Sequence, residues 1–373
     1  MIDQTTNIAN KRFVTESLRA VADAEPDALD DALARAYAPD ARWRGSHPLN
    51  ERRGLAAIAE VWTALKRAVP DVERRDLLVV GGEYEGVQMV AAMGHHVGRW
   101  ERDWLGMPAS GGVLRLRHGE VHALRDGRIV LSSCLWDVLD AMRQCGPLAG
   151  GMGPGFWPIA PSRGTEMHWL APLAGDGTSI VAREPEEGAA SLAQTLAMHK
   201  ALADFGEGGG DEEVTREALI AMPQRDHWHP KLMWYGPAGI GTGRGLAGFV
   251  DAHQRAFRLA FPNRQGGAQL TDREKGSHEG GGHYVRLGDG PYSVTGGWPS
   301  VRAEHRGGAL FGTGPTGRAV EMRVMDFYSH HEGLIRENWV PLDVPHLLLQ
   351  MGIDVFERLQ TQFGPGRTGL ARD

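Results

Sequence analysis

The hydrophobic positions of this chain follow the same order of helix and strand patterns in each half. In the first half, apolar residues recur at helical spacing through 9–37, and again between Arg53-Gly54 and Pro70. Short runs typical of strands, separated by glycine-rich turns, then follow at 77–82, 87–96, 113–124 and 128–136. Helices followed by antiparallel strands predict an α+β fold rather than a βαβ one.

The second half repeats this order with recognisable residues. Trp43-Arg44-Gly45 falls on Trp234-Tyr235-Gly236 at an offset of 234 − 43 = 191, and Arg53-Gly54-Leu55-Ala56 then falls on Arg244-Gly245-Leu246-Ala247 without a gap. A later block matches at an offset of 206, where Asp137 falls on Asp343. The change in offset corresponds to about 15 extra residues, which fit the glycine-rich stretch 271–284. We therefore predict a duplicated domain.

The expected architecture is two tandem cones, each a curved antiparallel sheet wrapped on helices. We place the first domain at 8–148, a Gly/Pro-rich linker at 149–188 and the second domain at 189–365. A cone of this kind has an apolar interior that suits a small molecule. We also expect the two cones to form a pseudo-dimer within one chain, and a further homodimer is left open.

Composition narrows the classes of partner. The formal charge is −7 and no basic run is interleaved with aromatics, which argues against a nucleic-acid partner. There is no apolar run of the roughly 20 residues that span a bilayer, and no leader pattern at the N-terminus. The two cysteines form no CxxC pair. The plain expectation is a cytoplasmic protein that binds a small molecule.

The closing segments carry the motifs of a known family. A histidine and a TGPTG turn at 305–318 are followed by a strand, a hairpin and Trp339-x-x-x-Asp343 before a final helix. The first half shows this order more loosely, from GHHVGRW (94–100) to RQCG (143–146). The chain resembles SnoaL-like polyketide cyclases (ester cyclases), which implies the NTF2-like, or cystatin-like, α+β cone. It further implies ring closure by aldol condensation, with an acidic residue as acid/base and no metal or cofactor.

The resemblance places the acidic residue at Asp343 in the second copy and at Asp137 in the first. A carboxylate beside an apolar surface has a raised pKa and can take a proton near neutrality. The alternative for both is a helix N-cap, since each precedes a predicted helix. His305 matches the family histidine in the second copy, and His96 (or His95) matches it in the first, either as catalytic donors or as turn histidines satisfied by backbone.

Strand alternation predicts which side chains line the second cone. Met325, Phe327 and Trp339 share one face of the hairpin 322–342, and this face is the more apolar, so we expect it to face the interior. Trp234, Tyr235 and His253 are expected to join them as substrate-binding or wall residues. The histidine pairs at 227–229 and 330–331 lack a matching carboxylate spacing, and no metal is expected.

The leading hypothesis is a cyclase or aldol-type enzyme that acts on a small carbonyl or ester substrate in the second cone. The second copy is preferred because it keeps the fuller motif. One alternative is a protein that binds a small molecule without turnover. Another is a hydratase or epoxide hydrolase, in which Glu337, Asp326 and Asn338 hold a water molecule.

Overall fold

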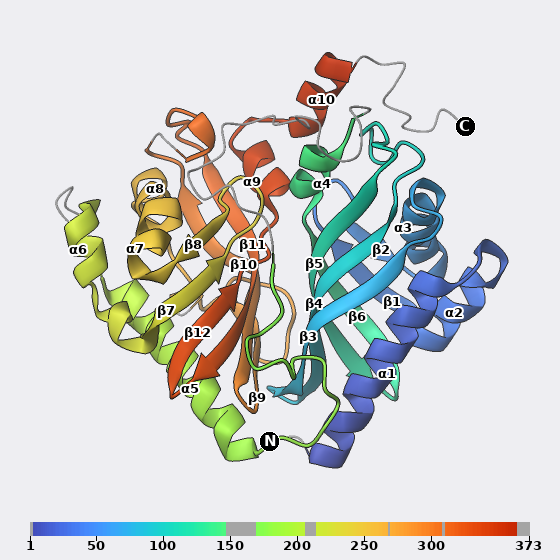
Figure 1. The fold of residues 1–373 in the computed structure, drawn as a ribbon, viewed down its shortest axis with the longest axis horizontal. Helices are drawn as coiled ribbons and strands as arrows, with labels where there is room; N and C mark the ends of the chain where they lie inside the picture. Colours follow the sequence, from blue (N-terminus) through green and yellow to red (C-terminus); the bar gives the residue numbers. More distant parts are fainter. Residues whose placement is uncertain (1–2, 147–168, 206–213, 268, 308–309, 364–373) are drawn as a thin grey trace.

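The computed structural model describes residues 3–146, 169–205, 214–267, 269–307 and 310–363. Residues 149–168, the first half of the predicted linker 149–188, lie outside this description. The described chain forms two six-stranded sheets with helices, in two consecutive halves (Figure 1). The predicted fold class, two α+β cones in tandem, is confirmed.

The first cone comprises the elements from α1 to α4. Its helices are α1 (Gln4–Asp23), α2 (Leu29–Ala36), α3 (Leu55–Ala68) and α4 (Val138–Gln144). Its strands are β1 (Tyr37–Gly45), β2 (Glu51–Arg53), β3 (Glu73–Tyr84), β4 (Val87–Arg99), β5 (Val113–Arg125) and β6 (Arg128–Trp136).

The second cone comprises the elements from α5 to α10. Its helices are α5 (Pro185–Asp204), α6 (Arg216–Ala221), α7 (Gly245–Phe249), α8 (Arg255–Ala260), α9 (Val344–Gln350) and α10 (Val355–Phe363). Its strands are β7 (Trp228–Tyr235), β8 (Thr242–Arg244), β9 (His283–Asp289), β10 (Tyr292–Glu304), β11 (Ala319–His331) and β12 (Leu334–Trp339).

The two sheets have the same topology. The strand order is β2-β1-β6-β5-β4-β3 in the first and β8-β7-β12-β11-β10-β9 in the second. Each sheet is mixed rather than wholly antiparallel, because β1 pairs with β6 in parallel, as β7 does with β12. The parallel pairs arise because the first and last strands of each sheet are joined by a long connection, which in the first cone includes α3 and the strands β2 to β5.

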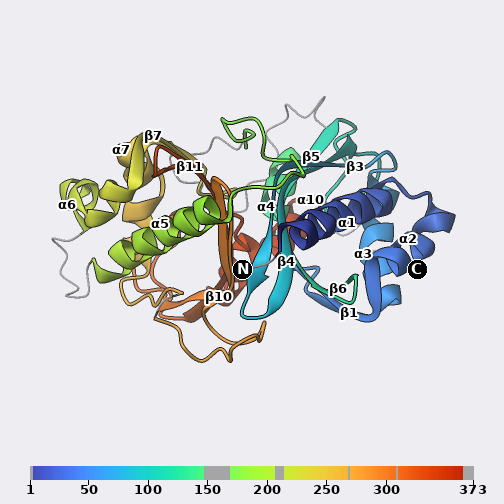
Figure 2. The ribbon, with the colours of Figure 1, turned by 90° about the horizontal axis from the view of Figure 1, so that it is seen from below.

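The sheets lie back to back in the middle of the molecule, with helices on the outer sides (Figures 1 and 2). Their facing surfaces are apolar and interdigitate in one cluster of buried side chains from both halves, including Leu78, Met93, Val285, Phe327 and Trp339. Each cone therefore opens toward its own helices, away from the other cone. None of the described helices is long and apolar enough to cross a membrane.

One helix differs between the cones in a way that affects the interior. α3 is a regular helix whose buried stripe, Ile58, Val61, Trp62 and Leu65, follows helical spacing. Its counterpart is α7 and α8 joined by a π-helical turn at Val250–Gln254. The helices end before Pro70 and Pro262, an offset of 262 − 70 = 192 instead of 191, so the second helix holds one extra residue. A π-helical turn accommodates one inserted residue within a helix, and the turn at Val250–Gln254 includes His253.

Candidate functional site

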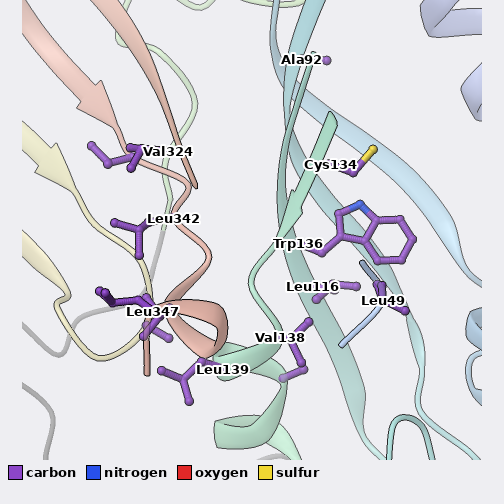
Figure 3. Close-up of a cluster of buried hydrophobic side chains, with 14 of the residues drawn as sticks. Leu49, Ala92, Leu116, Cys134, Trp136, Val138, Leu139, Val324, Leu342 and Leu347 are labelled. Atoms are coloured by element: carbon purple, nitrogen blue, oxygen red, sulfur yellow. The ribbon is translucent and has the colours of Figure 1, made fainter. Parts of the chain in front are cut away.

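A cavity of about 500 Å³ lies inside the second cone, between its sheet and its helices. Most of its wall is apolar and aromatic, including Trp228, Trp234, Phe249, Phe257, Val324 and Leu342. A cavity of this size suits a small organic molecule. Figure 3 shows Val324 and Leu342 pointing away from the first cone, toward this interior.

Asp326 is the carboxylate of the cavity wall. It comes from the middle of β11, and Asn338 on the neighbouring β12 donates from Nδ2 to its Oδ1 at 3.4 Å. Tyr328, two residues along the same strand, lines the cavity on the same face, and its Oη lies 2.7 Å from His199 Nε2 on α5. The sheet and the opposite helix together place a carboxyl, a phenol and an imidazole on one wall.

The protonation of this group follows from its surroundings. Burial raises the pKa of Asp326 to about 7, and hydrogen bonds from Asn338 and Tyr328 only partly oppose this. Burial also lowers the pKa of His199 to about 4, so its ring is neutral at pH 7. The carboxyl therefore exchanges its proton near neutral pH, beside uncharged hydrogen-bonding groups.

Trp234 and His253 form an aromatic stack on the cavity wall. Trp234 and His253 both line the cavity, and their rings stack with centroids 4.5 Å apart and an interplanar angle of 10°. Burial lowers the pKa of His253 to about 3, with a further contribution from the charges of Arg264 and Arg258. This stack offers a flat, uncharged surface for a planar ligand.

The prediction that Met325, Phe327 and Trp339 line the cone is wrong. These side chains lie in the apolar cluster between the two sheets, and Trp339 stacks there on Tyr235 with centroids 5.4 Å apart. Tyr235 therefore also lies at the interface and not in the cavity. The odd face of the hairpin is the more apolar because it packs on another sheet, while the even face, with Asp326, borders the cavity.

The structure places Asp343 and Asp137 outside the cavity, at matched contacts between the cones. Asp343 caps α9 through the backbone N–H of His346 at 3.2 Å, and it accepts the N–H of His47 from the first cone at 3.0 Å. Arg323 pairs with it at 3.0 Å. The N-cap alternative describes this geometry, and the catalytic placement of Asp343 in the second cone does not.

Asp137 makes the symmetry-related contacts. It caps α4 through Asp140 N–H, pairs with Arg117 and accepts the N–H of Ala238 from the second cone at 2.9 Å. The partners His47 and Ala238 are themselves 191 residues apart, and the two aspartates are 206 apart. Each aspartate thus accepts a backbone N–H of the other cone, from residues at equivalent positions of the two halves.

His305 lies in a turn rather than on the cavity wall. Its Nδ1 is 3.1 Å from Thr316 Oγ1, its backbone N–H donates to Arg318 O, and its ring packs on Phe261. These contacts correspond to the turn-histidine alternative. His305 shapes the TGPTG turn and is not among the residues that line the cavity.

His96 lies in the interior of the first cone, within a network of buried polar groups. Its Nε2 is 3.7 Å from Glu120 Oε1, and its ring contacts Trp62 and Trp136. Arg74 pairs with Glu120 at 2.6 Å. Burial alone raises the pKa of Glu120, but the charge of Arg74, together with the neighbouring His118, His122 and His96, outweighs burial and holds that pKa well below its ordinary value. Three buried tryptophans, Trp43, Trp62 and Trp136, pack around this network.

The histidine pairs do not gather ligands for a metal. The ring centroids of His229 and His331 are 5.9 Å apart. His330 Nε2 lies 3.1 Å from the hydroxyl of Ser293 and 3.2 Å from that of Thr195. Among the described residues, no group of three or more His, Cys, Asp or Glu side chains is arranged to hold a metal ion.

Sequence reasoning gave Asp326 only a secondary place, beside Glu337 and Asn338 in the hydratase alternative. Glu337 is now excluded from the wall, because its Oε2 accepts from Ser329 and from Leu173 N–H. One signal was available: at the offset of 206, Glu120 falls on Asp326, acid on acid. Tyr328, His199 and the loop arginine Arg264 gave no sequence signal.

The comparisons with known proteins concern one cone at a time. A family model described as SnoaL-like polyketide cyclase matches residues 15–145. This is the half that we expected to be the less complete copy. No curated protein matches the chain.

Solved structures resemble single cones at low sequence identity. TsrD from Streptomyces laurentii is 21% identical over 40% of this chain and 100% of its own, with a TM-score of 0.32. An NTF2-like protein of unknown function from Burkholderia pseudomallei K96243 is 16% identical over 36% of this chain and 95% of its own, with a TM-score of 0.29. A protein with a ketosteroid isomerase-like fold from Catenulispora acidiphila DSM 44928 is 13% identical over 36% and 92%, also at 0.29.

Proposed function

We propose that the second cone binds a small, mainly apolar carbonyl compound and that Asp326 transfers the proton in a cyclase or aldol-type reaction. The family match supports a cyclase or small-molecule-binding role in general. The observation that carries the finer proposal is the position of Asp326: a carboxyl in the wall of an apolar cavity, with a pKa of about 7. This carboxyl takes the role that the sequence assigned to Asp343.

The chemistry needs a base and a donor on one wall. The carboxylate of Asp326 takes a proton from the carbon next to the substrate carbonyl, and the electron pair of that C–H bond moves to the carbonyl oxygen. Once Asp326 has taken up the proton, the hydroxyl of Tyr328 no longer needs to donate to that carboxyl and donates a hydrogen bond to this oxygen instead, while His199 at 2.7 Å orients the phenol. The enolate carbon then attacks a second carbonyl of the same substrate, whose oxygen receives the proton from Asp326, or the carbon takes that proton back.

Proton exchange tests the proposal without the natural substrate. The bicyclic ketone 2-tetralone fits a cavity of about 500 Å³, and its acidic C–H positions exchange with D₂O in a way that NMR follows. We expect the protein to accelerate this exchange, with a rate that rises through about pH 7 as Asp326 loses its proton. Asp326→Asn should reduce the acceleration by about 10²- to 10⁴-fold.

The matched control is Asp343→Asn, which changes the same functional group outside the cavity. We expect it to keep the exchange activity within a few-fold of wild type. If Asp326→Asn exchanges 2-tetralone as fast as wild type, Asp326 is not the base. If wild type binds the ketone but never accelerates its exchange, the protein is a binding protein.

The hydratase or epoxide hydrolase alternative also has a specific contact. The 3.4 Å separation of Asp326 Oδ1 and Asn338 Nδ2 lets the pair share one water molecule, which the carboxylate would activate. Hydrolysis of styrene oxide to the diol separates this reaction from enolisation, because 2-tetralone has no epoxide ring that water can open. A protein that hydrolyses the epoxide and leaves the ketone protons in place belongs to the alternative class.

We further infer that the two cones are copies of one ancestral domain, arranged as an internal pseudo-dimer. Equal strand order and the exchanged contacts of Asp137 and Asp343 support this. Our domain limits remain 8–148 and 189–365, although the first helix of the second cone already begins at Pro185.

A further inference from the structure

Arg264 stands out among the charged residues of the cavity. It lies in the loop that follows α8 and lines the cavity beside Pro262 and Asn263. Its guanidinium donates to the backbone oxygen of its own turn, Phe261 O, at 3.3 Å. In the part of the chain that the structure describes, no carboxylate lies within 4.0 Å of it. Burial correspondingly lowers its pKa.

The two other arginines of the described cavity wall are already engaged. Arg258 donates to the carbonyl oxygens of Phe205 and Leu202 at 2.9 and 3.0 Å. The guanidinium of Arg286 lies over the ring of Tyr84 from the first cone, 5.6 Å from its centroid. Arg264 has only the 3.3 Å hydrogen bond to Phe261 O among the described residues, and a half-buried guanidinium without a counter-charge favours an incoming anion.

The position of Arg264 also indicates where that anion would lie. Gln265, the neighbour of Arg264, bridges to Arg302 on β10, and Arg302 pairs with Glu321 on β11, five residues before Asp326. The cation and the carboxyl therefore border different parts of the wall. The charge of Arg264 also acts on His253, which stacks on Trp234. A ligand that uses both must be elongated, with its charge remote from the reacting carbon.

We propose that the cavity selects a carboxylate-bearing compound, whose anionic end pairs with Arg264 and whose flat apolar body packs on the Trp234–His253 stack. Arginine suits this role because its fork donates two parallel hydrogen bonds to a carboxylate. Anion recognition by itself requires no turnover. Only the further statement that the opposite end meets Asp326 rests on the proposed function.

A pair of probes that differ in one charge tests the inference. Calorimetry compares 2-naphthoate with methyl 2-naphthoate, which has the same ring system and no charge. We expect wild type to bind the carboxylate at least about tenfold more tightly than the ester, and Arg264→Gln to lose this preference. Arg264→Lys keeps the charge without the fork and should retain part of it.

The control for loss of a positive charge is Arg225→Gln, since Arg225 is exposed and pairs with its neighbour Asp226. It should bind both probes as wild type does. Equal affinity of wild type for the two probes, failure of wild type to bind either at millimolar concentration, or an unchanged preference in a folded Arg264→Gln protein would each overturn the inference. Thermal unfolding followed by circular dichroism verifies the fold of each variant.

Binding of 2-naphthoate and exchange of 2-tetralone depend on different residues, so the two measurements separate the anion site from the acid/base group. Asp326→Asn should bind 2-naphthoate at least as well as wild type, because it removes a negative charge from the wall. If the naphthoate preference depends on Arg264 while Asp326→Asn leaves 2-tetralone exchange unchanged, the anion site stands and the acid/base assignment falls.

Discussion

Glu120 and Asp326 occupy the same position in the two cones and behave in opposite ways. They are 206 residues apart, and the neighbouring strand pairs Ala92 with one and Thr295 with the other. Arg74 pairs with Glu120 and contributes most to the lowering of its pKa, whereas no salt bridge to Asp326 is found among the described residues and burial raises its pKa to about 7. The protonation of a carboxyl at one place in a fold thus depends on the charged groups around it.

The interiors differ in the same direction. Trp136 in the first cone and Leu342 in the second are also 206 residues apart. Trp136 is buried in the interior of the first cone and donates from Nε1 to Glu120 Oε1 at 2.7 Å. Leu342, whose side chain is smaller, lines the cavity of the second cone (Figure 3). The interior of the first cone holds this ion-paired network and the tryptophans around it, and the second cone encloses the cavity of about 500 Å³.

Glu120→Gln should produce the largest change in stability. It leaves the buried guanidinium of Arg74 with Asp76 as its remaining carboxylate partner, at 2.8 Å. Losing one member of a buried ion pair costs about 3 kcal/mol of unfolding free energy. Since the pKa of Glu120 is lowered by folding, its contribution is present above its ordinary pKa of 4.5 and is lost at lower pH.

Denaturant unfolding at pH 7 and at pH 3.5 measures this loss. The difference between wild type and Glu120→Gln should shrink at the lower pH, and 2-tetralone exchange should survive in the folded variant. An unfolding free energy equal to that of wild type at pH 7 would mean that the ion pair is not stabilising.

Asp343→Ala and Asp137→Ala test whether the two cones are held together symmetrically. Each removes a helix cap and leaves one backbone N–H of the other cone without its acceptor. We expect each to cost about 2 kcal/mol of unfolding free energy, with both equal to within a factor of two. Amide hydrogen exchange should increase at His47 in the first variant and at Ala238 in the second. Loss of 2-tetralone exchange in the folded Asp343→Ala protein would restore Asp343 as a catalytic candidate.

Asp326→Asn should raise the unfolding free energy at high pH, whereas Glu120→Gln lowers it. Folding raises the pKa of Asp326 from 3.8 to about 7, so its contribution is complete below pH 3.8 and is lost as the pH rises through 7. A neutral amide avoids this loss and should add roughly 1 to 2 kcal/mol of unfolding free energy at pH 8. Thermal or denaturant unfolding at pH 8 and at pH 4 measures it, with no gain expected at pH 4. A variant less stable than wild type at pH 8 would contradict the raised pKa.

Much of the fold followed from the sequence because repeated spacing is a property of the chain itself. The turn at Asp126-Gly127 and the offset of Asp137 from Asp343 needed no tertiary information. The face of β11 that lines the cavity did not follow, since apolar side chains suit either a cavity or a second sheet. Met325 and Phe327 are buried against the other cone, a contact that alternation within one hairpin cannot reveal. Arg264 could not be identified for a related reason: whether an arginine has a carboxylate partner among the described residues depends on the whole surrounding wall.

Leu342→Trp should convert the hollow cone toward the packed one and have the smallest of these effects. It introduces the side chain that the first cone carries at Trp136, and the indole would occupy part of the cavity of about 500 Å³. Because an existing space receives the added volume, we expect little change in stability but an approximately tenfold weaker binding of 2-naphthoate, or ~1.4 kcal/mol. Leu349→Trp on the exposed side of α9 is the matched control and should bind normally. Undiminished binding by Leu342→Trp would place the ligand elsewhere, and the contrast between the two interiors would then say nothing about where this protein binds small molecules.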